Sequence, residues 1–302
     1  MAENINPYTQ HSGPPRLLPS FVCYADILGY KNMVEQSIDT GNGEIFLARL
    51  HKALSKAYQR IYEQSKLGVD VPLYAVKVFT DNIVVGYPIQ DFTRDRGNSE
   101  IIDVFGIFSE LQISLAIEGF FLRGGIAFGG HYMDDNIVFG NAFLDAYKLD
   151  IHDGPPRLSL ADSVREIVRS QKNYYGYIEY SPHYRHLLLD SDGKVYLDYL
   201  NEAFSGFPDC GIFLELIDRH KLEIAKKLDE HKTDISLRSK FEWAACYHNF
   251  TCRDFARRNS NPSKEDADGE KVAAAEDAQK LLNYLINIEP LPEPSKIAFD
   301  TI

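Results

Sequence analysis

Two aspartates each close a strongly apolar run, and they are the residues of this chain best suited to chemistry. Asp26 ends a run that begins at Phe21, and Asp81 follows the run from Tyr74 to Phe79. A carboxylate in such a run is costly to bury unless a cation or hydrogen-bond donors compensate its charge. Two metal ions about 3.5–4 Å apart activate a hydroxyl group and hold a triphosphate for in-line displacement. The pair therefore predicts phosphoryl transfer assisted by two metal ions.

Both aspartates stand where a strand is expected to end. Residues 20–28 are apolar on both faces, which is typical of a central strand covered on both sides. Residues 71–79 and 83–87 are predicted to form the two strands of a tight hairpin. If these strands are neighbours in one sheet, Asp26 and Asp81 meet at one edge of its surface.

The order of the predicted elements up to residue 150 is β-α-β-β-α-β-β-α. The remaining elements of this part are helices over 31–66 and 100–118, a strand pair over 120–128 and 132–139, and a helix that begins at 142. This order predicts an α+β fold of the ferredoxin-like or palm type, with helices on one face of an antiparallel sheet.

Changes in composition divide the chain into three parts. Residues 1–19 are polar and rich in proline, which predicts a loose N-terminal arm. Residues 20–155 form the main domain, and residues 156–302 are expected to be a mostly helical C-terminal extension packed on its core. Two short apolar runs in the extension, 158–160 and 194–200, either extend the sheet or form a small second one. Its long helices are expected at about 210–230, 235–257 and 270–287.

The charge balance excludes some classes of partner. The 302 residues include 44 acidic and 32 basic side chains, a formal net charge of −12. Such a balance argues against broad binding to nucleic acid or to an anionic membrane. The apolar runs are shorter than the roughly 18 residues that a spanning helix needs, and the first residues lack the pattern of a signal peptide. We therefore expect a cytoplasmic protein.

Four segments, taken together, resemble the motifs of class III nucleotidyl cyclases. They are Phe21–Tyr30, Lys77–Asp81, Leu122–Gly129 and Phe139–Asp150, and they follow one another in the order of that family. The resemblance covers residues 20–150. It implies the class III cyclase fold for the main domain.

The resemblance also implies roles for individual residues. Asp26 and Asp81 would bind two divalent ions, Mn²⁺ or Mg²⁺, with the main-chain carbonyl of Ile27 as a further ligand. Arg123 would contact the triphosphate, where its planar fork suits phosphate oxygens. Lys148 stands where the family has its transition-state arginine, so it joins the two aspartates as a catalytic residue.

Some positions depart from the family pattern. Leu144 stands at the family's catalytic asparagine. Lys77 matches a lysine that reads adenine in adenylyl cyclases, but Ile137 replaces the aspartate that works with it. The pocket is therefore not expected to read adenine in the usual way. Tyr24, which shares the face of Asp26, would contact the nucleotide together with Lys77.

The variants of the last two motifs look most like bacterial cyclases of the Pycsar antiphage system. The resemblance implies that UTP is converted to 3′,5′-cyclic UMP and pyrophosphate, and that the product activates a partner effector. It also implies a homodimer with its sites at the interface. The alternatives are a cytidylate cyclase that makes cyclic CMP, a non-catalytic nucleotide sensor on the same fold, and a palm-type polymerase or oligonucleotide cyclase. The net charge disfavours the last of these.

Overall fold

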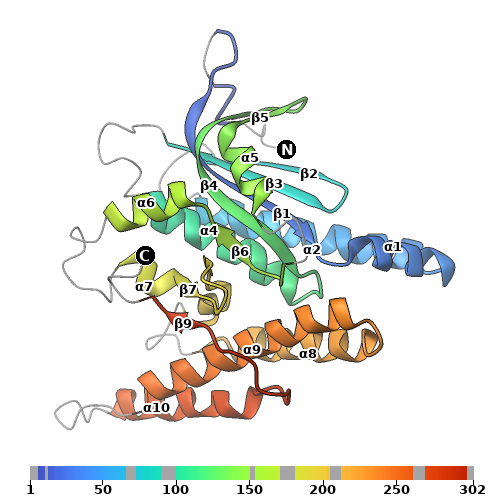
Figure 1. Ribbon diagram of the computed structural model, residues 1–302, viewed down its shortest axis with the longest axis vertical. Coiled ribbons are helices and arrows are strands. Elements are labelled where there is room, and N and C mark those ends of the chain that lie inside the picture. The colour runs from blue at the N-terminus through green and yellow to red at the C-terminus, as the bar shows by residue number, and fades with distance from the viewer. Residues whose placement is uncertain are drawn as a thin grey trace.

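One mixed sheet runs through both halves of the chain, with β1 (Leu18–Ile27) between β3 and β4 (Figure 1). The computed structural model describes residues 6–10, 13–65, 73–89, 100–149, 154–170, 181–204, 212–260 and 269–297. Within these residues the strand order is β2-β3-β1-β4-β6-β8-β7-β9, and β5 pairs with β4. The other strands are β2 (Ala75–Phe79), β3 (Asn82–Pro88), β4 (Leu122–Met133), β5 (Val138–Gly140), β6 (Leu158–Leu160), β7 (Leu187–Leu189), β8 (Val195–Leu197) and β9 (Ser295–Lys296).

Pairing in this sheet is mostly antiparallel, as predicted for an α+β fold. The exception among the described strand pairs is β4 with β6, which are parallel. The prediction of two separate strands over 120–128 and 132–139 is wrong in detail, because β4 continues unbroken from Leu122 to Met133. The architecture is compatible with a ferredoxin-like or palm fold.

One face of the sheet is covered by α2 (Gly43–Ser65) and α4 (Glu100–Ala116). A shorter helix, α1 (Tyr30–Asp39), precedes α2 in the chain. Side chains of β1 that face these helices, including Phe21 and Cys23, are fully buried. The α4 helix is buried almost all round, because further helices pack on its side away from the sheet. Its buried residues accordingly include polar ones, Glu110 and Gln112, as well as apolar ones.

A different helix lies on the opposite face of the sheet. The helix α5 (Asn141–Lys148) packs its Ala142 and Ala146 against Val22 and Tyr24 of β1. Gly125 of β4 permits this close approach, since a Cβ there would lie 2.5 Å from Leu149 Cβ. The prediction that helices cover one face only is therefore wrong for α5.

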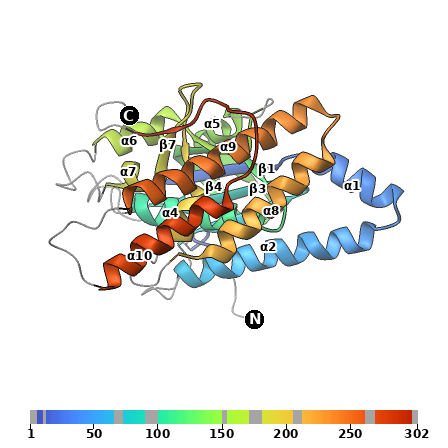
Figure 2. The ribbon, with the colours of Figure 1, turned by 90° about the horizontal axis from the view of Figure 1, so that it is seen from below.

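The C-terminal helices form a second apolar cluster against the outer side of α4. They are α8 (Leu214–Glu230), α9 (Ile235–Arg258) and α10 (Gly269–Lys280), nearest the viewer in Figure 2. The shorter elements between β6 and the end of the described chain are α6 (Asp162–Ser170), α7 (Pro182–His186), η2 (Tyr199–Phe204) and η3 (Leu281–Tyr284). None of the helices among the described residues combines the length and apolar character that a membrane crossing requires.

The short runs after residue 155 extend the main sheet rather than forming a second one. Leu158–Leu160 pairs with Gly124–Ile126 of β4, and Ser159 pairs in turn with Tyr196 of β8. Hydrogen bonding therefore crosses the predicted boundary between the main domain and the extension without a break.

The predicted loose arm, residues 1–19, is anchored in its described part. Tyr8 is 3% exposed and packs edge-on against His131, with 5.3 Å between the ring centroids. The side-chain amide of Asn6 donates to the carbonyl of Met133 at 3.0 Å, and β1 already begins at Leu18. The apolar and amide side chains of this segment override its polar and proline-rich composition.

A buried chain of hydrogen bonds joins four C-terminal elements through two histidines. The Nδ1 atoms of His220 and His248 lie 3.0 Å apart, and the Tyr199 hydroxyl lies 2.8 Å from His220 Nε2. His248 Nε2 lies 3.0 Å from the carbonyl of Tyr284, which can only accept. His248 therefore carries its proton on Nε2 and accepts on Nδ1 from His220, whose Nε2 accepts from Tyr199.

Acid is expected to weaken the fold through these histidines. Burial lowers the pKa of His248 from 6.5 to about 4, and burial together with the neighbouring His248 lowers the pKa of His220 well below 6.5. The neutral forms stabilise the fold fully above pH 6.5, and this contribution is lost as the pH falls toward 4, because the unfolded chain then binds more protons. From pH 7.5 to 5.0 we expect the free energy of unfolding to fall by about 2 kcal/mol from His248 alone. Equal urea midpoints at these two pH values would contradict the prediction.

Candidate active site

The predicted site lies on the sheet face that carries α5, at the end of β1. Asp26 stands opposite Asn82 of β3 on one side and opposite Arg123 of β4 on the other. Residues directly opposite one another project to the same face of a sheet. The next row on this face holds Tyr24 and Lys77, each opposite Val84. The pairing register thus places most of the predicted site residues on the four neighbouring strands β2, β3, β1 and β4.

Asp26 and Arg123 form a two-point ion pair. Arg123 Nε lies 2.8 Å from Asp26 Oδ1, and Nη2 lies 2.9 Å from Oδ2. Both side chains are about one-fifth exposed, at 21% for Asp26 and 18% for Arg123. Such parallel charge-assisted bonds are among the stronger hydrogen bonds in proteins. Arg123 therefore neutralises Asp26 and remains close to the surface, where an anion can reach it.

Asp81 lies in the two-residue turn between β2 and β3, beside the end of β1. Its carbonyl accepts a hydrogen bond from the amide of Ile27 at 3.1 Å, so the turn is fixed to the strand that carries Asp26. Oδ1 of Asp81 accepts from the Thr80 hydroxyl at 2.8 Å and from Asn82 Nδ2 at 3.0 Å. The register therefore places the turn that holds Asp81 beside the end of β1 that carries Asp26.

Thr80 gives the turn an uncommon backbone conformation. Its φ of 60° is the only positive φ of a residue other than glycine in the described chain. A positive φ at the first central residue alone is typical of a type II′ hairpin turn, where glycine is preferred. The left-handed conformation costs a residue with a Cβ roughly 1–2 kcal/mol. The chain thus adopts at Thr80 a backbone conformation that glycine would favour.

Tyr24 supports the site from beneath α5. The residue is 7% exposed, and its ring meets Phe143 and Tyr147 edge-on, with centroid distances of 6.0 and 5.1 Å. Its hydroxyl donates to Asn82 Oδ1. Burial, followed by the charges of Asp26, Tyr147 and Asp81, raises the pKa of Tyr24 to about 12. The hydroxyl therefore stays protonated and acts as a donor.

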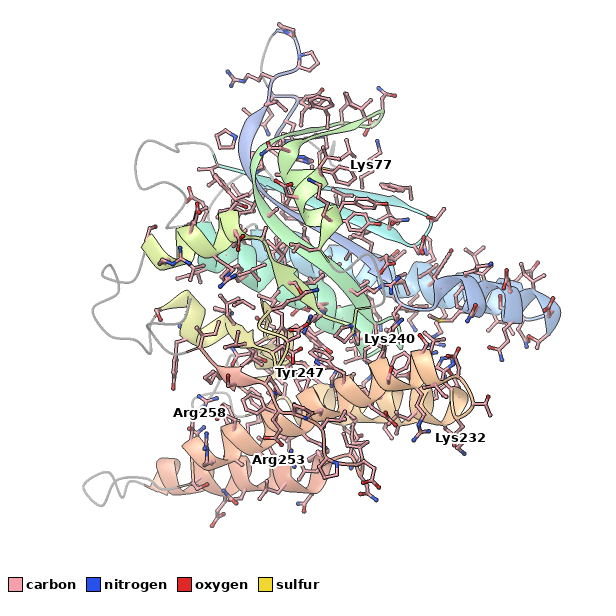
Figure 3. The ribbon with its side chains drawn as sticks, viewed as in Figure 1. Lys77, Lys232, Lys240, Tyr247, Arg253 and Arg258 are labelled. Carbon is pink, nitrogen blue, oxygen red and sulfur yellow. The ribbon has the colours of Figure 1, made fainter. Side chains whose placement is uncertain are left out.

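Lys77 contacts the β4–β5 hairpin. Its Nζ donates to the carbonyls of Asp134 and Asp135, each at 3.0 Å. Figure 3 labels Lys77 on β2, on the side of the sheet where this hairpin folds over. Lys77 thus lies on the same face and in the same row of the sheet as Tyr24, and this row is next to the row of Asp26.

Lys148 ends α5 on the exposed surface. Its Nζ lies 3.1 Å from Asp145 Oδ1, and its side chain is 70% exposed. Among the described residues no hydrogen bond or ion pair joins Lys148 to Asp26 or Asp81. Within one chain, Arg123 therefore pairs with Asp26 and Tyr24 reaches the Asp81 turn through Asn82, while Lys148 pairs with Asp145.

The elements that border the site carry several exposed apolar side chains. Leu144 and Tyr147 of α5, Ile137 and Phe139 of the β4–β5 hairpin, and Phe79 of β2 are each exposed by 42% or more. Large apolar side chains gathered on one surface are typical of an interaction site.

The donor set fits divalent ions that are shared with a phosphate ligand. In the described part of the chain, no cluster of three or more His, Cys, Asp or Glu side chains is arranged to hold a metal ion alone. Mg²⁺ is commonly bound by one or two carboxylates together with substrate phosphates and water, and Asp26 and Asp81 offer that number. Oδ2 of Asp81 accepts no hydrogen bond from any described residue, which leaves it available as a ligand.

Sequence reasoning missed Thr80 and Asn82 as parts of the site. Both are polar, and both flank Asp81 directly in the turn. Their side chains, unlike those of Phe143 and Tyr147 on α5, are close to Asp81 in the sequence itself. A polar residue on each side of a candidate ligand was the available signal.

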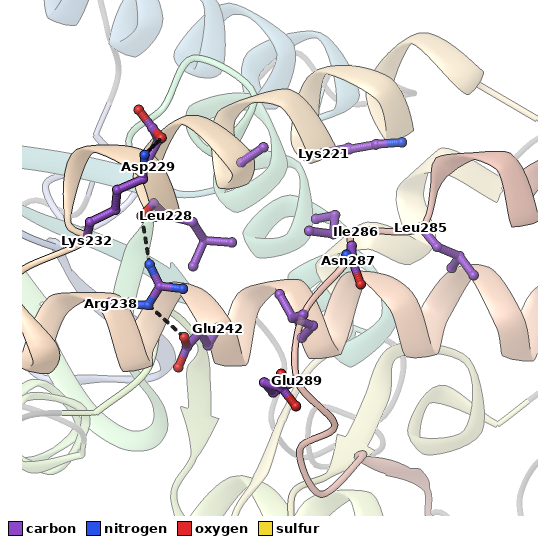
Figure 4. Close-up of a pocket in the computed structure, with 12 residues that line it drawn as sticks. Lys221, Leu228, Asp229, Lys232, Arg238, Glu242, Leu285, Ile286, Asn287 and Glu289 are labelled. Atoms are coloured by element: carbon purple, nitrogen blue, oxygen red, sulfur yellow. Dashed lines mark hydrogen bonds and ion pairs between the residues drawn. The ribbon is translucent and has the colours of Figure 1, made fainter.

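A separate pocket of about 710 Å³ lies between α8, α9 and residues 285–289 (Figure 4). Its basic side chains are engaged within the protein: Arg238 donates to the Leu228 carbonyl at 3.3 Å and to Glu242 at 2.9 Å. Lys221 donates to the Asn283 carbonyl at 3.3 Å. The pocket therefore offers a ligand little uncompensated charge, in contrast to the aspartate site.

No protein-family model matches this chain, and no curated protein matches it closely enough to count as a relative.

Proposed function

We propose that the protein is a class III nucleotidyl cyclase that forms a 3′,5′-cyclic nucleotide and pyrophosphate. The observation that carries this proposal is that Asp26, paired with Arg123, ends β1 beside the β2–β3 turn that holds Asp81. Two carboxylates with an arginine beside them supply the ligands and the positive charge that transfer from a triphosphate needs.

Each residue has a task in the proposed reaction. Asp26 and Asp81, with the carbonyl of Ile27, hold two divalent ions, Mn²⁺ or Mg²⁺. When bound, such ions lower the pKa of the ribose 3′-hydroxyl and neutralise charge on the phosphates. Arg123 leaves one or both oxygens of Asp26 and turns its fork toward the β- and γ-phosphates. After this exchange the charge of Asp26 is compensated by the divalent ions and the charge of Arg123 by the phosphates.

We favour UTP as substrate and cyclic UMP as product, with CTP and cyclic CMP as the alternative. The support is the resemblance of Leu122–Gly129 and Phe139–Asp150 to bacterial Pycsar cyclases, together with Ile137 in place of an adenine-reading aspartate. In that role the product is a second messenger of antiphage defence that activates an effector protein.

A homodimer would complete the site. The single chain leaves Lys148 at the exposed end of α5, and exposed apolar side chains surround it. We propose that two copies pair through this surface, with Lys148 of one copy reaching the triphosphate held by the other. A lysine there supplies charge without the two-point geometry of arginine.

Product analysis tests the proposal directly. The purified protein is incubated with an equimolar mixture of ATP, GTP, CTP and UTP and Mn²⁺, and the products are identified by mass spectrometry. The expected result is cyclic UMP with an equal amount of pyrophosphate. Binding of a nucleotide measured by calorimetry, without formation of any product, would instead favour the non-catalytic sensor. That alternative is suggested by Leu144, which stands where the resembled family has its catalytic asparagine. Linear products with pyrophosphate would favour a polymerase.

A further inference from the structure

The carboxylate of Asp81 is held on one side only. Oδ1 accepts two hydrogen bonds, from Thr80 Oγ1 at 2.8 Å and from Asn82 Nδ2 at 3.0 Å. Oδ2 accepts none from the described residues. Hydrogen bonds to one oxygen of a ligating carboxylate orient the other and fix which oxygen faces the ion.

The direction of the Asn82 amide is set by Tyr24. The Tyr24 hydroxyl donates to Asn82 Oδ1, so the Nδ2 group must point the other way, toward Asp81. The reversed amide would place its oxygen against the Asp81 carboxylate, where two acceptors repel. The protonated hydroxyl of Tyr24 is thus connected through the side-chain amide of Asn82 to the carboxylate of Asp81.

Thr80 contributes the second donor. Its hydroxyl has the Phe79 carbonyl and the Asp81 carboxylate within reach, and it also accepts from Asn82 Nδ2 at 3.1 Å. The charged carboxylate is the stronger acceptor. A glycine at this position would relax the strained φ but would also remove the hydroxyl donor.

We propose that Asn82, oriented by Tyr24, and Thr80 are positioning residues that fix Asp81 so that Oδ2 alone faces a divalent cation. This inference rests on the proposed function only in so far as Asp81 binds metal. Asn82 and Thr80 are not catalytic residues, because they act through Asp81.

The test measures metal binding without turnover. Binding of Mn²⁺ is followed by the electron paramagnetic resonance signal of the free ion, with inorganic triphosphate as the only other ligand. We expect Asn82→Ala to weaken Mn²⁺ binding by about 10–100-fold, as for other residues that support a metal ligand. Asn42→Ala, the same change in the exposed turn between α1 and α2, is the matched control and is expected to bind Mn²⁺ as the parent does.

Two further variants separate positioning from folding. Thr80→Gly is expected to weaken Mn²⁺ binding while its melting temperature stays equal to or above that of the parent. Tyr24→Phe and Asn82→Ala are expected to be non-additive, since Tyr24 acts through Asn82. Additive losses would overturn the link between Tyr24 and Asn82.

The outcomes also distinguish this inference from the proposed function. Folded Asn82→Ala and Thr80→Gly proteins that bind Mn²⁺ as the parent does, while Asp81→Ala loses binding, would overturn the positioning roles and leave the cyclase proposal standing. Weakened binding in both variants, in a parent that makes no cyclic nucleotide, would support the positioning roles and refute the cyclase.

Discussion

Asp26→Ala is expected to lower the rate of cyclic nucleotide formation at least about a thousandfold, which corresponds to roughly 4 kcal/mol in the barrier. The variant removes a ligand that both proposed metal ions share, and positioning with charge neutralisation supplies most of the catalysis in phosphoryl transfer. Asp81→Ala is expected to have a loss of similar size. Product is measured by mass spectrometry at saturating Mn²⁺ and nucleotide.

Two controls make this prediction specific. Asp39→Ala removes an exposed aspartate at the end of α1 and is expected to leave the rate unchanged. Asp26→Asn keeps the size of the side chain and separates loss of charge from loss of packing against Arg123. Full activity in Asp26→Ala or Asp81→Ala would rule out the assignment of the site.

Arg157→Met is expected to be among the most damaging single changes to stability, lowering the free energy of unfolding by about 3–5 kcal/mol. The Arg157 side chain is 1% exposed and forms ion pairs with Asp190 and Asp192. Asp190 is itself 3% exposed, so the variant leaves a buried carboxylate without its cation. The indole of Trp243 donates to the same Asp190 oxygen at 2.7 Å but carries no charge. Urea denaturation at pH 7.5 measures the loss.

The matched control is Arg253→Met. Arg253 pairs with Glu293, and both side chains are more than 40% exposed. Exposed pairs of this kind contribute about 0–1 kcal/mol. A second replacement, Asp190→Asn, is expected to recover part of the stability that Arg157→Met loses, because it removes the uncompensated charge. Similar losses for Arg157→Met and Arg253→Met would show that burial of the first pair has little effect.

The places of Asp26 and Asp81 at the ends of apolar runs, and the hairpin that joins β2 to β3, could be predicted from the sequence because these are local features. The pairing of β1 with β3, which brings Asp26 beside the turn that holds Asp81, joins segments far apart in the chain and was only a condition of the prediction. The helical content of the C-terminal extension was predictable for a similar reason: α8 and α9 are long and carry strong patterns. Local signals of this kind need no knowledge of distant contacts.

Other features depended on contacts that the sequence does not display. The sequence predicts a helix over 100–118 but not how deeply it is buried: α4 is buried almost all round, since α8 and η2 pack on it from residues far along the chain. Strands β6 and β8 lie within the predicted runs 158–160 and 194–200, but β7 was not predicted, because its three residues are too few for alternation to reveal a strand. Tyr8 shows the same effect at the other end, because only folding brings His131 to it.

The parallel pairing of β6 with β4 sets a limit on how this protein can be shortened. A chain cut after residue 155 would lose β6 and bare the peptide groups of Gly124–Ile126, which adjoin Arg123. Unprotected strand edges recruit other strands, so such a fragment would tend to self-associate. In the full chain, pairing with β6 protects this edge of β4 from such association.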